Sequence, residues 1–183
     1  MRLFTALDLP PDVLGRLDEL LRRLKPAANI SWSPVQNLHV TTKFIGEWPE
    51  SRLAELKAAF AGIPSRPPLS VAIRKVGFRP NPFSPRHFWC GIEAPGIERL
   101  AADTDQAAAS LGIARETRPF SPHLTLARIR DRIDMQPLRE AIAALRTLEF
   151  GSFEARSWIL YQSTLKPTGS VYTKLAEFPL TKQ

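Results

Sequence analysis

Two of the three histidines in this chain stand in matching surroundings that suit acid–base chemistry. His39 opens the segment HVTTKFIG and His123 opens HLTLARIR, and a threonine follows each of them two positions later, Thr41 and Thr125. Both segments have the β-branched, alternating character of strands. Because residues i and i+2 of a strand point to the same face, each segment is predicted to present an imidazole beside a hydroxyl.

A pair of imidazoles can supply both a base and an acid to one displacement. An unperturbed histidine has a pKa of about 6.5, so its neutral and protonated forms are both accessible near neutral pH. Positioned proton transfer of this kind is worth about 10²- to 10⁴-fold in rate. Threonine hydroxyls can donate hydrogen bonds to the non-bridging oxygens of a phosphate. Strict alternation places Lys43 on the face of His39 and Thr41, so it is predicted to add a positive charge at the rim of the site.

The two motifs indicate an internal duplication. They lie about half the chain apart, and each follows a short loop that contains Ser-Pro, at residues 33–34 and 121–122. Two lobes related by a pseudo-two-fold axis would bring the two strands together. The result would be a cleft lined by His39, His123 and their two threonines.

Arg128 and Phe44 each lie five positions after their histidine. Strict alternation would place both on the face opposite the histidines. A twist or bulge at the strand end would instead return them to the cleft, where a guanidinium plane and a phenyl ring can stack on a base. The alternatives are a surface or core-rim salt bridge for Arg128 and a core position for Phe44.

The remaining pattern indicates an α+β or a mixed α/β fold with antiparallel sheets, since strands and helices are mixed and both hairpins and crossovers occur, and we expect α+β. Strands are predicted at residues 2–8, 39–48, 69–78, 87–93, 123–129, 149–165 and 171–180, and helices at 11–24, 49–62, 95–111 and 134–147. The segment 149–165 is one long strand or two strands joined at Gly151, and it pairs with 171–180 as a hairpin. We expect residues 1–183 to form a single bilobal domain.

Composition limits the possible settings and partners. The single cysteine, Cys90, excludes an internal disulfide framework and a cysteine-based zinc cluster, and it fits a reducing, cytoplasmic setting. The net charge of +7 favours anionic partners. No apolar run approaches the ~18 residues of a membrane span, and the first residues have the pattern of a strand rather than of a signal peptide. A cytoplasmic monomer without a membrane contact is therefore expected.

The paired motifs resemble the two H-x-T-x motifs of the two-histidine (2H) phosphoesterase family. The similarity is closest to its branch of RNA 2′,3′-cyclic phosphodiesterases, once called 2′-5′ RNA ligases. It extends beyond the motifs to LFTALDLP at the start, NLHVTTKFIGE, FSPHLTLAR and the closing LYQSTLKPTGSVYTKL. The resemblance therefore covers nearly the whole chain.

This resemblance implies two lobes, each an antiparallel sheet flanked by helices, around a positively lined central cleft. It implies that an RNA end or small nucleotide with a 2′,3′-cyclic phosphate is opened to a 2′-phosphomonoester. His123 would be the general base on water, His39 the general acid, and Thr41 and Thr125 would hold the phosphate, with no metal or cofactor required. Thr42 departs from the family pattern, which often has leucine there, and is expected to face away from the cleft.

Two other functions remain open from the sequence. The same histidines would serve the reverse reaction, in which a 5′-hydroxyl is joined to a cyclic end through a 2′-5′ bond. A non-catalytic module that binds RNA ends is the alternative from another class. His87 lacks a following threonine and is expected to be structural, with a contact at the mouth of the cleft as the alternative. Trp89 is expected to be a packing residue rather than a platform for a base. The proline-rich segment 79–86 is expected to be a solvated loop, with a contact to RNA through Arg79 and Arg86 as the alternative.

Overall fold

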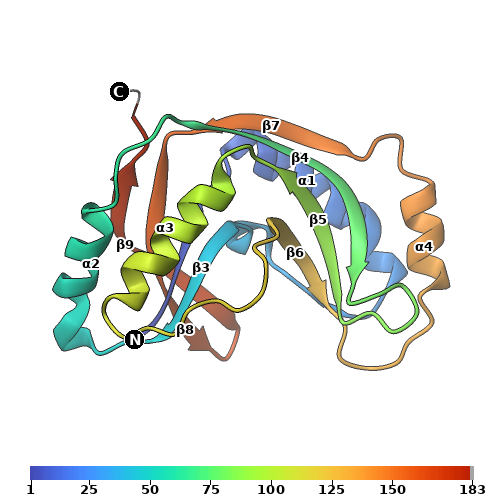
Figure 1. The fold of residues 1–183 in the computed structure, drawn as a ribbon. Helices are drawn as coiled ribbons and strands as arrows, with labels where there is room; N and C mark the ends of the chain where they lie inside the picture. Colours follow the sequence, from blue (N-terminus) through green and yellow to red (C-terminus); the bar gives the residue numbers. More distant parts are fainter. Residues whose placement is uncertain (182–183) are drawn as a thin grey trace.

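The computed structural model describes residues 1–181, which form two antiparallel sheets and four α-helices (Figure 1). The strands are β1 (Arg2–Leu7), β2 (Ser31–Trp32), β3 (Val40–Glu47), β4 (Leu69–Arg79), β5 (His87–Glu93), β6 (His123–Arg128), β7 (Glu149–Ala155), β8 (Ser157–Lys166) and β9 (Gly169–Pro179). The α-helices are α1 (Pro11–Leu24), α2 (Leu53–Ala61), α3 (Ile97–Ala109) and α4 (Gln136–Ala143), and short 3₁₀ turns lie at Lys25–Ala27, Val35–Asn37 and Glu50–Arg52. The predicted α+β class is confirmed.

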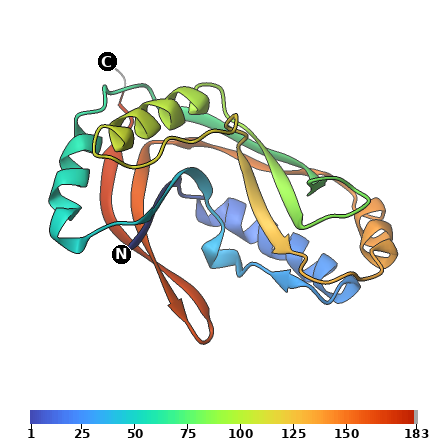
Figure 2. The ribbon, with the colours of Figure 1, turned by 60° about the horizontal axis from the view of Figure 1, so that its bottom comes forward.

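The first sheet has the order β3-β1-β8-β9 and the second has the order β2-β6-β5-β4-β7. All paired strands are antiparallel, and β8 and β9 form the predicted hairpin, which extends beyond the body of its sheet (Figure 2). Strands β3 and β6, which carry the two motifs, therefore belong to different sheets.

The helices are exchanged between the two sheets. Helix α1 follows β1 of the first sheet but contacts β7 of the second, whereas α3 follows β5 of the second sheet and contacts β3 of the first. Helix α1 buries Val13, Leu17, Leu21 and Leu24 at helical spacing, and it begins with Pro11 at a position that needs no backbone N–H donor. Because of this exchange, the two sheets share the main hydrophobic core.

The segment 149–165 breaks at Arg156 and not at Gly151, so the predicted joint is wrong. The chain crosses there from the second sheet to the first, because β7 pairs with β4 whereas β8 pairs with β1. Gly151 has a positive φ of 117° inside β7, and a Cβ there would lie 3.3 Å from Val13 Cγ2. The glycine therefore marks the close approach of α1 rather than the end of a strand.

The buried core contains Cys90, whose pKa is raised by burial to about 12. A thiol of this kind behaves as a small apolar side chain and is almost never ionised near neutral pH. Over residues 1–181, no helix has the length and apolarity that a bilayer crossing requires.

Candidate active site

The fold brings the two predicted motifs together from different sheets. His39 lies directly before β3 and His123 is the first residue of β6, and these two strands contact each other. The segment that leads to His39 is also hydrogen-bonded to β6. The Ser33 backbone N–H donates to the carbonyl of Leu126 at 2.8 Å, and the Ser33 hydroxyl donates to the carbonyl of Thr125 at 2.9 Å.

Both imidazole rings are held in the same way. His39 Nδ1 lies 3.0 Å from the carbonyl oxygen of Asn37, and His123 Nδ1 lies 2.8 Å from the carbonyl oxygen of Ser121. In each case the carbonyl belongs to the residue two positions before the histidine. Because a carbonyl only accepts, Nδ1 carries the proton and Nε2 is left to take up or release one.

A β-bulge follows each motif at the same position. In β3, Thr41 pairs with Ala6 and Lys43 pairs with Thr5, so that Thr42 is the extra residue. A bulge inserts one residue into one strand and reverses the side-chain alternation beyond it. Thr42 faces away from the histidine, as expected, and its hydroxyl lies 2.7 Å from that of Thr5.

The second bulge lies in β6. Thr125 pairs with Trp89 and Ala127 pairs with Phe88, so that Leu126 is the extra residue. Leu126 and Ala127 are consequently both buried, and Arg128 is turned to the face of His123 and Thr125, where it is exposed.

The first bulge turns Phe44 to the face of His39. Phe44 is 70% exposed, its ring centroid lies 6.4 Å from that of Phe4, and Phe4 lies 6.4 Å from the imidazole of His39. Phe44 is therefore not a core residue. Strict alternation and a bulge were the two alternatives for Phe44 and Arg128. The structure has a bulge in both β3 and β6.

The prediction that Lys43 lies at the rim of the site is wrong. The bulge turns its side chain to the back of the sheet, where it is buried. Its Nζ donates to Asp105 Oδ1 at 2.7 Å and to the carbonyl of Ala114 at 3.0 Å. Lys43 therefore attaches α3 to β3 and takes no part in the cleft.

His39 lies among aromatic rings. Its ring centroid is 4.8 Å from that of Tyr161 and 5.6 Å from that of Tyr172, and its side chain is only 11% exposed. Burial lowers the pKa of His39, whereas its bond to the Asn37 carbonyl and the charge of Asp8 act in the opposite direction. Asp8 Oδ1 lies 3.5 Å from Nε2, so a carboxylate faces the nitrogen that would carry the working proton.

Asp8 is itself held by two further groups. The Tyr161 hydroxyl donates to Oδ1, and Lys174 Nζ lies 2.6 Å from Oδ2. Burial and the neighbouring Asp8 raise the pKa of Tyr161, so its hydroxyl stays protonated as a donor. The charge of Lys174 lowers the pKa of His39 and partly offsets the effect of Asp8.

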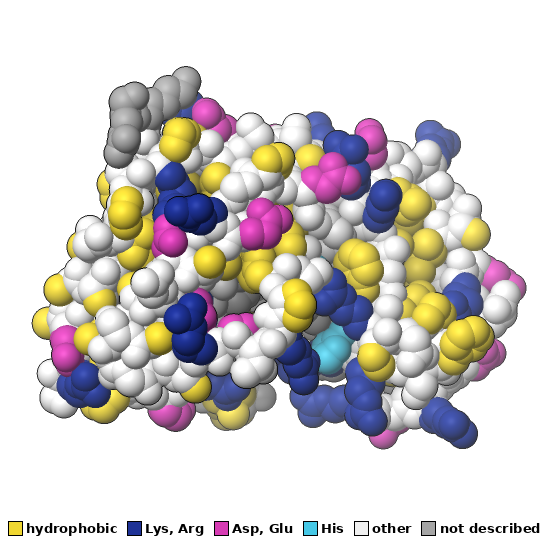
Figure 3. All heavy atoms as spheres, in the orientation of Figure 1, with side chains coloured by type: hydrophobic (Ala, Val, Ile, Leu, Met, Phe, Trp, Pro, Cys, Tyr) yellow, Lys and Arg dark blue, Asp and Glu magenta, His cyan; other side chains and the backbone are white. Residues whose placement is uncertain are grey.

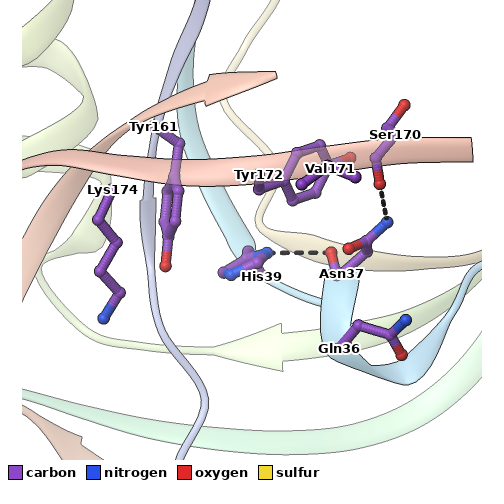
Figure 4. A pocket seen from close by; sticks show the side chains of 8 residues that line it. All are labelled: Gln36, Asn37, His39, Tyr161, Ser170, Val171, Tyr172 and Lys174. Carbon is purple, nitrogen blue, oxygen red and sulfur yellow. Dashed lines mark hydrogen bonds between the residues drawn. The ribbon is translucent and has the colours of Figure 1, made fainter. Parts of the chain in front are cut away.

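A pocket of ≈410 Å³ opens in front of His39 (Figure 4). The pocket is lined by Gln36, Asn37, His39, Tyr161, Ser170, Val171, Tyr172 and Lys174. Asn37 Nδ2 donates to the carbonyl of Ser170 at 2.9 Å, which joins the β8–β9 hairpin to the segment that orients His39. Amide, hydroxyl, aromatic and ammonium groups therefore surround the pocket beside the imidazole.

His123 has a cationic environment instead. Burial lowers the pKa of His123, and the charge of Arg79 lowers it further. Arg79 Nη2 donates to the hydroxyl of Ser121 at 2.8 Å. In the space-filling view, several Lys and Arg side chains lie around a histidine on this face of the molecule (Figure 3). In the described part of the chain, no carboxylate faces His123 as Asp8 faces His39.

Several residues of the site carried no signal in the sequence. Asp8, Tyr161 and Lys174 lie far from the motifs along the chain, and they reach His39 because β1 pairs with β3, β8 with β1 and β9 with β8. Among residues 1–181, no group of three or more His, Cys, Asp or Glu side chains has an arrangement that could hold a metal ion.

Comparison with known proteins identifies the family of the chain. The model of the "LigT like Phosphoesterase" family matches residues 7–89 and 92–172. A Methanocaldococcus jannaschii protein named RNA 2′,3′-cyclic phosphodiesterase is 30% identical, over 97% of this chain and 100% of that protein. A Thermus thermophilus protein of the same name is 33% identical, over 98% of this chain and 90% of that protein.

Solved structures show the same fold. The crystal structure of TT0787 from Thermus thermophilus is similar with a TM-score of 0.82 and 32% identity, over 98% of both chains. Apo LigT from E. coli is similar with a TM-score of 0.80 and 26% identity, over 99% of this chain and 98% of that chain. The family match spans most of the sequence and includes both histidine motifs, and the chain therefore belongs to the LigT-like phosphoesterase family.

Proposed function

We propose that this protein is an RNA 2′,3′-cyclic phosphodiesterase that opens the cyclic phosphate to a 2′-phosphomonoester. One observation carries the proposal: two imidazoles on contacting strands are held identically through Nδ1, so that each offers Nε2 for proton transfer. The relatives named RNA 2′,3′-cyclic phosphodiesterase support the same reaction.

In the proposed step, His123 and His39 act on opposite sides of one phosphorus atom. Nε2 of neutral His123 takes a proton from water as the water oxygen forms a bond to phosphorus. The bond between phosphorus and the 3′ oxygen breaks, and Nε2 of protonated His39 gives its proton to that oxygen. The product keeps its phosphate on the 2′ oxygen. His123 then releases its proton to solvent and His39 takes one up, which restores both histidines.

The charges around the two rings support this assignment of acid and base. Asp8 favours the protonated form of His39, as a general acid requires. Arg79 disfavours the protonated form of His123, as a general base requires. Burial lowers the pKa of both histidines, but the charge of Asp8 opposes this effect at His39, whereas the charge of Arg79 adds to it at His123. The two neighbouring charges therefore act in opposite directions, as an acid–base pair requires.

The remaining groups suit a nucleotide. We assign Thr41 and Thr125 to the non-bridging phosphate oxygens, because each stands on the face of its histidine. Arg128 and Phe44, both turned to the cleft by bulges, are assigned to the base of the terminal nucleotide. E. coli LigT has been crystallised with 3′-AMP and with phosphate, which are ligands of the same chemical class.

The test is product analysis on a short RNA that ends in a 2′,3′-cyclic phosphate, with EDTA present. We expect a 2′-phosphomonoester to form, since the proposed reaction uses no metal. Formation of a 3′-phosphate would contradict the roles of the histidines, and inhibition by EDTA would contradict the metal-free reaction. RNA that is bound but released unchanged would support a binding module, and addition of a 5′-hydroxyl strand measures ligation in the same assay.

A further inference from the structure

A tryptophan lies flat on the cleft face of the second sheet. Trp89 of β5 pairs with Thr125 of β6 and with Gly77 of β4, and directly paired residues share one face of an antiparallel sheet. A Cβ at Gly77 would lie 2.6 Å from Trp89 Cζ2, and one at Gly91 would lie 3.3 Å from Cζ3. The ring therefore occupies space that two glycines leave open, beside the threonine of the site.

An arginine covers this ring. The Arg79 Cζ atom lies 5.0 Å from the ring centroid of Trp89, and Arg79 Nη2 donates to the Ser121 hydroxyl at 2.8 Å. The indole N–H of Trp89 is buried and has no hydrogen-bond partner among the described residues. A hydrogen bond of the indole thus does not explain the position of the ring, whereas stacking against the guanidinium does.

Positive charge is concentrated around this stacked pair. Arg79 pairs with His87 across the strands, His87 pairs with Arg128, and Arg86 precedes His87. Within residues 1–181, none of the three arginines forms an ion pair with a carboxylate. Clustered like charges repel one another, and a polyanion that binds over them relieves this repulsion.

Five side chains of the second sheet form a row that leads away from the proposed site of catalysis. His123 and Thr125 lie on β6, Trp89 and His87 on β5, and Arg79 on β4, which are neighbours in that order. Neighbouring strands are about 4.8 Å apart, so Arg79 belongs to a strand about 10 Å from that of His123. A mononucleotide whose phosphate lies between the two histidines has only one phosphate and cannot also occupy this row, whereas an RNA strand can.

We infer that Arg79 and Trp89, together with His87 and Arg86, form a second nucleotide subsite that binds the nucleotide before the cyclic end. The inference rests on the proposed function and deepens it, because it names the residues that bind the RNA strand beyond its terminal nucleotide. Arg79 would contact the phosphate, and the flat guanidinium on Trp89 would offer its outer face to the base.

The test compares two substrates, adenosine 2′,3′-cyclic phosphate and a trinucleotide that ends in the same group. In the unmodified protein, kcat/KM should be higher for the trinucleotide. Arg79→Ala and Trp89→Leu should each reduce the trinucleotide-to-mononucleotide ratio of kcat/KM about tenfold. Any effect of Arg79 that acts through the protonation of His123 changes both substrates alike and cancels in the ratio.

The dependence on salt gives a second readout. Loss of one phosphate contact to a single strand should reduce the slope of log kcat/KM against log salt for the trinucleotide by about 0.7. Arg99→Ala is the matched control, because it removes the same charge from the exposed face of α3 and should leave both the ratio and the slope unchanged. If Trp89→Leu fails to fold, as circular dichroism would show, Arg79→Ala and Arg79→Lys decide the question.

Three outcomes separate this inference from the proposed function. Equal losses on both substrates, or a protein that does not prefer the trinucleotide, would overturn the subsite alone. Failure of the unmodified protein to open either cyclic phosphate would overturn the proposed function as well. A reduced ratio with a reduced salt slope supports the subsite.

Discussion

Thr42 and Leu126 are equivalent residues in the two halves of the molecule, since each is the extra residue of a β-bulge three positions after a histidine. Each bulge leaves the histidine and its threonine on the cleft face and turns the residue five positions after the histidine to the same face. The duplication therefore includes the backbone irregularity as well as the motif. This irregularity places Phe44 on the face of His39 and Arg128 on the face of His123.

The first prediction concerns the two histidines. His39→Ala and His123→Ala should each lower kcat for a 2′,3′-cyclic phosphate by at least about 10²-fold, because each removes one proton-transfer group. The double variant should be little worse than either single variant, since both act in one step. Thermal unfolding followed by circular dichroism should show a folded protein in each case. A variant that keeps a tenth of the activity would contradict the paired mechanism.

The second prediction concerns the pH profile. The rate should rise with pH as His123 loses its proton and fall as His39 loses its own. Asp8 raises the pKa of His39, whereas Lys174 lowers it, so Asp8→Asn should move the falling limb to lower pH. The rising limb should stay in place, because Arg79 and not Asp8 acts on His123. Profiles of kcat/KM on adenosine 2′,3′-cyclic phosphate measure both limbs, and an unmoved falling limb would rule out Asp8 as the partner of the acid.

The third prediction concerns the buried ion pair behind β3. Lys43→Met leaves the carboxylate of Asp105 buried without its main partner and should lower the free energy of unfolding by about 3 kcal/mol. The activity of the remaining folded protein should be unchanged, because Lys43 faces away from the cleft. Urea unfolding and hydrolysis assays on the same sample check the two parts.

The same pair gives a pH dependence of stability. Burial opposes the ionisation of Asp105, but hydrogen bonds from Lys43 and the Glu116 backbone, with the charges of Lys43 and Arg115, lower its pKa overall. A carboxyl with a lowered pKa in the folded state stabilises the fold above its unfolded pKa of about 3.9, and this contribution is lost as pH falls through the folded pKa. Asp105→Asn should therefore be destabilised at pH 7 and should lose less further stability in acid than the unmodified protein.

The fourth prediction concerns the ring of Trp89, on which Arg79 stacks. Gly77→Ala forces the ring of Trp89 to move, because the new Cβ would lie 2.6 Å from Cζ2. The preference for a trinucleotide over a mononucleotide should fall, while hydrolysis of the mononucleotide should persist. Gly15→Ala is the control, since nothing lies within 4 Å of a Cβ at that position of α1. This control should keep the preference and raise stability by about 0.5–1 kcal/mol. An unchanged preference in Gly77→Ala would separate the ring from substrate binding.

The sequence allowed the fold class and the contact between β3 and β6, the strands of the two motifs, to be predicted, because the duplication and strand periodicity are local patterns. Strict alternation failed for Lys43, since a bulge depends on how β3 pairs with β1. The break at Arg156 depends on a strand that changes sheets, which periodicity within the segment does not record. Asp8 joins His39 through long-range pairing alone, and no spacing along the chain indicated it.

The placement of β3 and β6 in separate sheets has a further consequence for the reaction. Within residues 1–181, β3 and β6 are not paired with each other. Their separation is set by packed apolar side chains and by the backbone contacts of β2 and Ser33 with β6. A close-packed interior transmits small displacements, and proton transfer is sensitive to shifts of about 1 Å. The turnover rate should therefore depend on how closely the interior is packed. Substitutions far from any substrate atom can slow the enzyme by changing the distance between its two imidazole rings.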